Sequence, residues 1–203
     1  AEAAYRRSLE LQPDAPPTLY NLARVLIAQR KAPGEAEWLL RQAISIKPLF
    51  TDASLLLGNR LMDQGKTQAA AHVLKTATEM EPESARAFVS LGTAERALGN
   101  MEAAEAAYRR AIEIKPAWAE AHFNLASLLG QQGRYRETIE ALERAVSADP
   151  TMALAHKNLG LLYLKVKRDP GRARRHLKRA VDLAPNHPEA AEIRRLLDTL
   201  PHS

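Results

Sequence analysis

The sequence contains no cysteine among its 203 residues. Such a chain forms no disulfide, offers no thiolate to a metal ion and has no cysteine nucleophile. No apolar run approaches the roughly 20 residues of a membrane-spanning helix, and no signal-peptide pattern is present. We therefore expect a protein that is not transmembrane. We favour a cytoplasmic location and leave a periplasmic or lumenal one open.

Residues that favour β-strands are also scarce. Aromatic residues make up 5% of the chain, and there are six valines and seven isoleucines. Alanine and leucine, which are strong helix formers, contribute 37 and 29 residues. Hydrophobic residues make up 46% and charged residues 26%, which excludes a disordered chain. The composition predicts an all-α protein.

A proline recurs at a nearly constant interval through the sequence. The successive intervals are 35, 34, 34, 34 and 35 residues. A period of this length is typical of repeat proteins in which each repeat is one supersecondary unit. The prolines are Pro13, Pro48, Pro82, Pro116, Pro150 and Pro185.

Further positions recur in register with these prolines. A leucine lies nine residues after each of the first five prolines and is followed by a small residue; later in each unit come a second small residue, a large one and an alanine. Small residues let two helix backbones approach, and large ones fill the space between neighbours. Each unit is therefore predicted to be two antiparallel helices. The positions are Leu22, Leu57, Leu91, Leu125 and Leu159; Ala23, Gly58, Gly92, Ala126 and Gly160; Ala36, Ala70, Ala104, Thr138 and Ala173; Leu40, Leu74, Tyr108, Leu142 and Leu177; and Ala43, Ala77, Ala111, Ala145 and Ala180.

The two 35-residue units contain one extra residue, which we expect in the turn between their two helices. Those turns contain Pro33-Gly34 and Pro170-Gly171, which break helices and tolerate an insertion. The other three turns carry Gly65, Gly99 and Gly133 at the end of a helix, where the left-handed conformation favours glycine.

This spacing and these residue types resemble the tetratricopeptide repeat (TPR) family over about residues 1 to 185. The resemblance implies an all-α fold, a right-handed α-solenoid of antiparallel helix pairs. We expect a single array over residues 1–203, and natural repeats N-terminal to it, because the first repeat lacks its first helix. The expected parts are a half repeat at 1–13, full repeats at about 16–48, 51–82, 85–116, 119–150 and 153–185, and a capping helix at about 188–199.

In TPR proteins the first helices of the repeats line a concave surface that binds peptides. The resemblance therefore implies a non-catalytic protein-interaction scaffold whose groove binds a peptide or a partner protein. The residues expected to line this groove are Tyr20, Asn21, Arg24, Leu55, Asn59, Met62, Arg86, Ser90, Thr93, Phe123, Asn124, Ser127, Gln131, Lys157, Asn158 and Lys165.

Three of these residues, Asn21, Asn124 and Asn158, share one column of the repeat. An asparagine amide both donates and accepts hydrogen bonds, so a row of them holds a peptide backbone without reading its side chains. The arrangement is similar to the asparagine ladder of O-linked N-acetylglucosamine transferases, although Leu56 and Ser90 interrupt it here. The alternative is that these are ordinary solvent-facing residues.

Some of the groove residues are apolar and suggest an anchor site for a partner side chain. The alternative is that about half of them pack into the core. This apolar stretch comprises Leu55, Leu56, Met62, Val89 and Phe123.

Positive charge is concentrated at the C-terminal end. Residues 151–203 have a net charge of +6, whereas the first 150 residues have −1. Such a patch attracts an acidic partner, an anionic membrane surface or nucleic acid. Because few aromatic residues accompany it, we do not expect nucleic acid, and a solvated helix face is the alternative. The patch consists of Lys167, Arg168, Arg172, Arg174, Arg175, Lys178 and Arg179, next to Lys165.

No catalytic, phosphate-binding or metal-binding motif occurs, and no cofactor is expected. His122 and His156 share one repeat column, but no cluster has the spacing of metal ligands, so both are expected to pack at the edge of the core. Trp38 and Trp118 are also expected to pack between helices. Two other functions stay open: a substrate-recruiting module of a larger enzyme such as a glycosyltransferase, and self-assembly into a homo-oligomer through residues 1–12.

Overall fold

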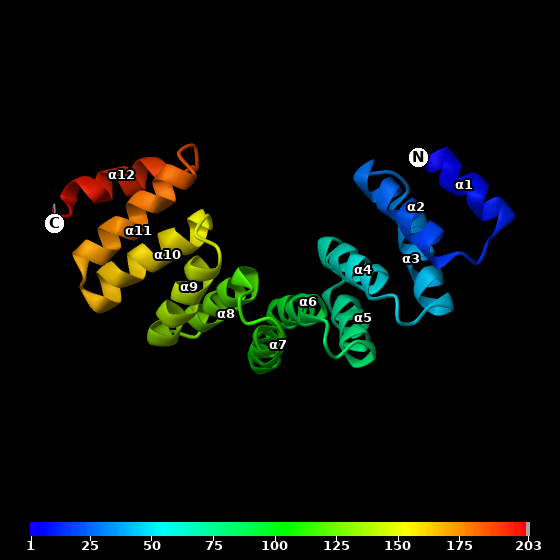
Figure 1. The fold of residues 1–203 in the computed structure, drawn as a ribbon, viewed down its shortest axis with the longest axis horizontal. Coiled ribbons are helices and arrows are strands. Elements are labelled where there is room, and N and C mark those ends of the chain that lie inside the picture. Colours follow the sequence, from blue (N-terminus) through cyan, green and yellow to red (C-terminus); the bar gives the residue numbers. More distant parts are fainter. Residues whose placement is uncertain (202–203) are drawn as a thin grey trace. The chain divides into compact units, whose positions relative to one another are not determined.

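The structure, a computed structural model, describes residues 1–201, which form twelve α-helices and one π-helical segment without a strand (Figure 1). None of these helices is both long and apolar enough to cross a bilayer. Five helix pairs follow one single helix and precede another, so the predicted all-α fold is confirmed. The elements are α1 (Glu2–Leu11), α2 (Pro16–Ala28), α3 (Pro33–Ile46), α4 (Thr51–Asp63), α5 (Thr67–Met80), α6 (Ala85–Ala97), α7 (Met101–Ile114), α8 (Ala119–Gln131), α9 (Tyr135–Ala148), α10 (Ala153–Leu162), η1 (Tyr163–Lys167), α11 (Pro170–Leu183) and α12 (Ala190–Thr199).

Prolines mark both the starts and the ends of the helices. Pro16, Pro33 and Pro170 lie in the first turn of α2, α3 and α11, where the missing N–H costs no hydrogen bond. Asp169 also caps α11, because its Oδ1 accepts a hydrogen bond from the Arg172 backbone N–H at 2.9 Å. Each of the six repeating prolines lies two residues after the last residue of a helix. The period of the sequence is therefore the period of the helix ends.

The two 35-residue repeats accommodate their extra residue in different ways. In the first, α2 ends at Ala28, and the following turn contains Arg30 (φ 53°) and Ala32 (φ 40°), both left-handed. In the last, α10 continues into the π-helical turn η1, and Arg168 then takes the left-handed conformation (φ 51°). The expected position in the turn is correct for the first repeat and wrong for the last. A π-turn takes up the additional residue inside the helix.

The recurring small and large residues form the interior of the helix pairs. Leu91 is half-buried, and all the other residues of the recurring columns are buried. Gly160 illustrates why the columns need small residues: a Cβ atom there would lie 2.7 Å from Leu177 Cγ and 3.1 Å from the Ala173 carbonyl oxygen. The backbones of α10 and α11 thus approach as closely as they do because residue 160 has no side chain.

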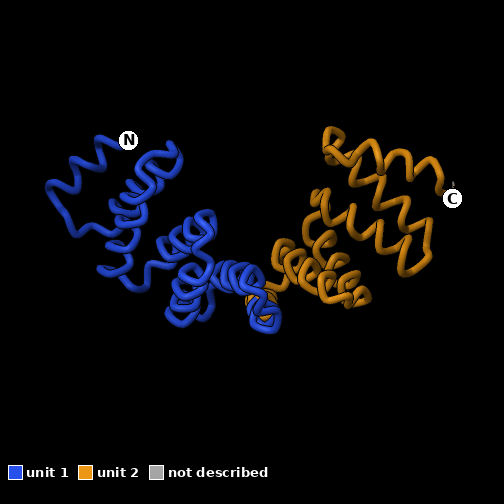
Figure 2. The backbone as a smooth tube through the Cα atoms, turned by 180° about the vertical axis from the view of Figure 1, so that it is seen from behind, with its two compact units in different colours: residues 1–107 blue, residues 108–203 orange. Residues whose placement is uncertain are grey.

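The chain forms two compact units, residues 1–107 and residues 108–203 (Figure 2). In the first unit the leucines of α2, α3 and α4 make the core, and Tyr5 and Leu9 of α1 pack against it half-buried. Trp38 of α3 is 56% exposed, so its expected packing role is wrong.

The second unit contains the end of α7, from Tyr108 on, and the elements α8 to α12. Its largest fully buried side chains are Tyr108 and the leucines at 128, 129, 142, 159 and 177. The last helix, α12, packs on α11 and buries Ala190 and Ile193, with Leu197 half-buried. This is the arrangement predicted for a capping helix.

Candidate functional site

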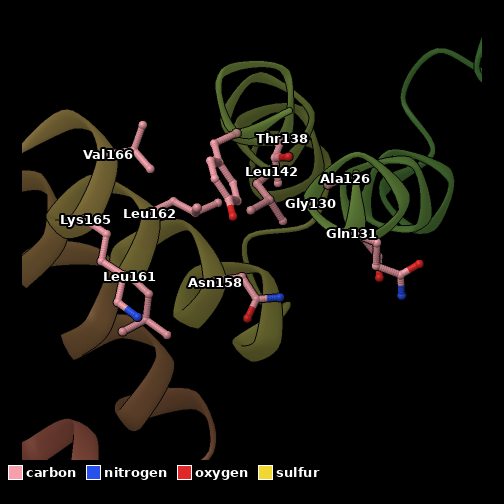
Figure 3. Close-up of a pocket in the computed structure, with 12 residues that line it drawn as sticks. Ala126, Gly130, Gln131, Thr138, Leu142, Asn158, Leu161, Leu162, Lys165 and Val166 are labelled. Carbon is pink, nitrogen blue, oxygen red and sulfur yellow. The ribbon is translucent and has the colours of Figure 1, made fainter. Parts of the chain in front are cut away.

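A groove of about 800 Å³ lies in the second unit between two successive first helices, α8 and α10, with α9 between them. Side chains of α10 and η1 face those of α8 and α9 across it (Figure 3). The tight turns at Gly133 and after η1 position these helices, because each lets the chain reverse within a few residues. The groove is lined by Ala126, Ser127, Gly130, Gln131, Tyr135, Thr138, Leu142, Asn158, Leu161, Leu162, Lys165 and Val166.

The groove combines an apolar interior with a few polar groups. Leu161, Leu162 and Val166 supply accessible aliphatic surface, and Tyr135, which is 49% exposed, supplies an aromatic ring. The polar members of the lining are amides, hydroxyls and one ammonium group, and they include no carboxylate. A mostly apolar concave surface with a few polar groups is the usual character of a ligand site.

Four residues predicted to line a groove are brought together here. Ser127 and Gln131 come from α8, Asn158 from α10 and Lys165 from η1. The part contributed by α9, namely Tyr135, Thr138 and Leu142, was not predicted, because the predicted groove comprised first helices only. The second small column, to which Thr138 belongs, was the signal that these residues lie close to α8.

Other predicted groove residues of the second unit do not line it. Phe123 and Asn124 are half-buried on α8, nearer its start. Lys157 donates a hydrogen bond from Nζ to a Glu189 carboxylate oxygen at 2.6 Å, and its side chain is 17% exposed. This ion pair lowers the pKa of Glu189. Lys157 therefore fastens the segment before α12 to α10, which corrects its assignment as a free groove residue.

In the first unit several predicted groove residues contribute to packing instead. Leu55 is 4% exposed within the core, so its assignment to the groove is wrong. Tyr20 is half-buried with its ring centroid 5.1 Å from that of Phe50, and the Arg24 guanidinium lies 5.5 Å from the Tyr20 ring. Met62 is half-buried against the core. Burial of Leu55 follows from its contact with α5 and α6, which the repeat period alone does not reveal.

The remaining predicted residues of the first unit are more accessible. Arg24 and Asn59 are exposed, and Asn21 and Ser90 are half-buried. Arg86 is exposed and forms an ion pair with Asp52 at 3.0 Å.

Thr93 is also half-buried, and its hydroxyl donates to the Val89 carbonyl oxygen of the preceding helical turn at 3.0 Å. Together these polar positions lie on α2, α4 and α6.

The predicted basic patch divides into exposed cations and structural ones. Arg174 is half-buried and donates to the backbone carbonyls of Leu197 and Leu200 at 2.5 and 3.0 Å. It thereby satisfies carbonyls at the C-terminal end of α12, where a cation is favoured. Its assignment to a free patch is therefore wrong. Arg172 is exposed but contacts Tyr163 and Asp169, and the other exposed members are Lys167, Arg168, Arg175, Lys178 and Arg179.

A stacked cluster ties η1 to α11. The Tyr163 and His176 rings are stacked at 5.7 Å with an interplanar angle of 6°, and the Arg172 guanidinium lies 5.4 Å from the Tyr163 ring. The Tyr163 hydroxyl donates to the Glu143 carboxylate and accepts from the Arg172 guanidinium at 3.1 Å. Burial and the Glu143 bond raise the pKa of Tyr163.

His156 extends this cluster, and its hydrogen bond to a backbone carbonyl determines its tautomer. Its Nε2 lies 3.2 Å from the Pro150 carbonyl oxygen, which only accepts, so Nε2 carries the proton. Its Nδ1 is then the acceptor for the Nδ1–H of His176 at 3.0 Å. Burial lowers the pKa of His156, and burial with the nearby His156 and Arg175 lowers the pKa of His176 to about 4. This pair stays neutral near neutral pH.

His122 makes the same bond as His156 one repeat earlier, because its Nε2 lies 2.8 Å from the Pro116 carbonyl oxygen. Both histidines are buried, as predicted for the edge of the core. Within residues 1–201 no group of three or more histidine, aspartate or glutamate side chains has metal-binding geometry.

Helix pairs that repeat in register, with tight turns between their members, define a helical repeat protein. The sequence model of the tetratricopeptide repeat family matches residues 55–118 and 123–188. The chain belongs to the TPR family. No curated protein sequence matches it significantly.

Solved structures share the fold at low sequence identity. YrrB, described as a TPR protein with an unusual peptide-binding site, is 22% identical with a TM-score of 0.70, and the match covers 96% of this chain and 100% of that one. PilF of Pseudomonas aeruginosa is 20% identical with a TM-score of 0.79, over 95% and 86% of the chains. MamA of Desulfovibrio magneticus RS-1 is 21% identical with a TM-score of 0.70, over 85% and 97%. At these identities the likeness shows the fold alone.

Proposed function

We propose that the protein is a non-catalytic interaction module that binds a peptide segment of a partner protein in the groove of α8, α9, α10 and η1. The observation that carries the proposal is a groove of about 800 Å³ with an apolar interior and few polar groups. This size is within the range of about 300 to 1,000 Å³ for sites that enclose a ligand. Membership of the TPR family supports the same reading. So does YrrB, a similar TPR protein with a peptide-binding site.

The apolar surface would bind one large side chain of the peptide. The half-buried Leu161 and Leu162 lose contact with water when such a side chain enters, which is worth about 25 cal/mol per Å² of apolar area removed from water. The ring of Tyr135 adds a flat surface next to them. A peptide with one bulky aliphatic or aromatic residue meets these requirements.

The polar groups would orient the peptide backbone. The Asn158 amide lines the groove and both donates and accepts, so it pairs with one peptide unit. Gln131 has the same capacity from the opposite helix. Of the three asparagines that share one repeat column, Asn158 is the one that lines this groove. We therefore propose that one or two amides hold the backbone, in place of a continuous asparagine ladder.

The test is to select twelve-residue peptides from a phage-displayed random library and to measure their affinities by fluorescence polarisation. Ser127→Arg inserts a bulky cation into the groove and is expected to weaken binding by about tenfold or more, as loss of a central contact does. Ser147→Arg is the matched control, because Ser147 is exposed on α9 and does not line the groove. Circular dichroism checks that both variants keep their helical content.

Two results would refute the proposal. One is that no peptide is enriched over the starting library. The other is that Ser127→Arg and Ser147→Arg bind the enriched peptides equally well, which would move recognition to another surface.

A further inference from the structure

The π-helical turn η1 distinguishes this groove from those the repeat period alone would produce. In the three 34-residue repeats the first helix has 13 residues and ends before a left-handed glycine. In the last repeat the α10–η1 segment runs from residue 153 to 167, and Arg168 takes the place of the glycine. The added residue therefore lengthens the wall of the groove. Lys165 and Val166 of η1 are part of that wall.

The turn is held by residues that do not line the groove. Tyr163 is 3% exposed, and its hydroxyl contacts both Glu143 and Arg172. The Asp169 backbone N–H donates to the Tyr163 carbonyl oxygen at 3.0 Å, which closes the turn. With its first residue fixed by α9 and α11, η1 presents Lys165 and Val166 in a defined position. A backbone held in this way loses little entropy on binding.

Positive charge gathers along η1 and the residue after it, and of these cations Lys165 lines the groove. Lys165, Lys167 and Arg168 are exposed, and none of them has an ion pair or side-chain hydrogen bond within the part of the chain that the structure describes. The nearest acidic residue in sequence, Asp169, is engaged with Arg172 at 3.4 Å. No carboxylate lines the groove. The charge that complements this wall is therefore negative.

We propose that η1 determines the specificity of the groove, and that the ligand is a peptide segment in which a large apolar residue lies next to aspartate or glutamate. The apolar residue contacts Leu161, Leu162 and Val166, and the carboxylates pair with Lys165 and Lys167. Both partners of each pair are near solvent, so each pair changes affinity by up to about fivefold and is weakened by salt. This inference rests on the proposed function and adds the chemical class of the peptide.

The first experiment repeats the peptide selection on three proteins. Wild type is expected to enrich peptides that combine a bulky apolar residue with aspartate or glutamate. The double variant Lys165→Glu/Lys167→Glu is expected to lose this acidic preference and to bind the wild-type peptides about tenfold more weakly at low salt. The control, Lys178→Glu/Arg179→Glu, changes the net charge equally on exposed positions of α11 and should select as wild type does.

A second experiment tests the turn itself. Deletion of Lys167 restores a 34-residue repeat and is expected to remove most binding while helical content is kept. Deletion of Lys31 shortens the other 35-residue repeat and should leave binding unchanged, because that insertion lies in a turn of the first unit. Equal loss in both deletions, or none in either, would contradict a special role of η1.

The outcomes separate the two proposals. Enriched peptides without aspartate or glutamate, or an acidic preference that survives Lys165→Glu/Lys167→Glu, would overturn the role of η1 and leave peptide binding intact. If the α11 control Lys178→Glu/Arg179→Glu loses the acidic preference to the same extent, the preference comes from the net charge of the protein. That result also overturns the inference. Failure to enrich any peptide would refute the proposed function itself.

Discussion

At the scale of single residues, glycines inside the helices determine how closely the two helices of a pair approach each other. Gly58 and Gly160 occupy one repeat column, and a Cβ at either position would lie less than 3.0 Å from a leucine of the paired helix. Contacts this short do not occur in real structures, so the leucine or the helix has to move. Gly130 is also inside a helix, but its nearest neighbour, Thr138 Cγ2, would lie at 3.6 Å.

Gly130 and Gly160 of the second unit therefore predict opposite effects of the same substitution. Gly160→Ala is expected to lower the free energy of unfolding by about 1–2 kcal/mol, because overpacking exceeds the gain in helix propensity. Gly130→Ala is expected to raise it by up to about 1 kcal/mol, since only the propensity changes. Urea unfolding followed by circular dichroism measures both. Equal effects would mean that α10 and α11 separate at no cost.

Arg168 predicts a gain of stability. It is an arginine in the left-handed conformation (φ 51°), which costs a residue with a Cβ about 1–2 kcal/mol relative to glycine. Replacement by glycine removes this cost, but part of the gain in stability is offset because glycine has greater conformational freedom in the unfolded chain. We expect Arg168→Gly to raise the free energy of unfolding by about 0.5–1 kcal/mol. Arg168→Ala removes the same side chain but keeps the strained backbone, so a rise of the same size in both variants would speak against the explanation.

At the scale of elements, the histidine pair makes the contact between α10 and α11 sensitive to acid. The pKa of His176 is about 4 in the folded protein, against an ordinary value of 6.5. Between these two pH values the unfolded chain binds more protons than the folded one. The free energy of unfolding therefore rises as the pH increases through this window. On acidification from pH 6.5 to pH 4 it falls by the same amount. Protonation of the pair also places a proton on both Nδ1 atoms and breaks their hydrogen bond.

The expected outcome is a steeper loss of wild-type stability between pH 6.5 and pH 4 than in His176→Gln, which lacks the titrating ring. His72→Gln, at an exposed position of α5, is the control and should follow the wild-type slope. Urea midpoints across this range measure the difference. Parallel curves for wild type and His176→Gln would show that the pair does not govern acid stability.

The elements also show how far the sequence predicts the site. The period and the small columns predicted the helix pairs, and they placed Ser127, Gln131 and Asn158 on a shared face, because both depend on residues within one repeat. Leu55 was misassigned because its burial depends on α5 and α6, which pack around it. The ion pair of Lys157 with Glu189 joins residues 32 positions apart, and no repeat column records it. The repeat period predicts contacts that recur in every repeat, and it does not predict contacts that differ from one repeat to the next.

At the scale of the whole molecule, stability is distributed along the chain. The described helix contacts join elements that are neighbours or next neighbours in the sequence. In such an array each repeat is stabilised by its own packing and by the adjacent repeats. Damage at one helix pair should therefore spread only a short distance.

Hydrogen exchange with Gly160→Ala tests this locality. We expect faster exchange in α10 and α11 and, to a smaller extent, in α9 and α12, because these helices pack against the altered pair. The amides of α2 and α3 should exchange as in wild type. Uniform acceleration over all helices would instead indicate that the chain opens as one cooperative unit.

The single-residue insertion at η1 has a consequence for how such a protein changes over generations. The α10–η1 segment is longer than the first helices of the 34-residue repeats, while the helix pairs before it keep their spacing. In a globular enzyme with a shared core, a comparable insertion disturbs many distant contacts. Here the described helix contacts join neighbours or next neighbours in the sequence, so one repeat is able to change in length without repacking of distant repeats.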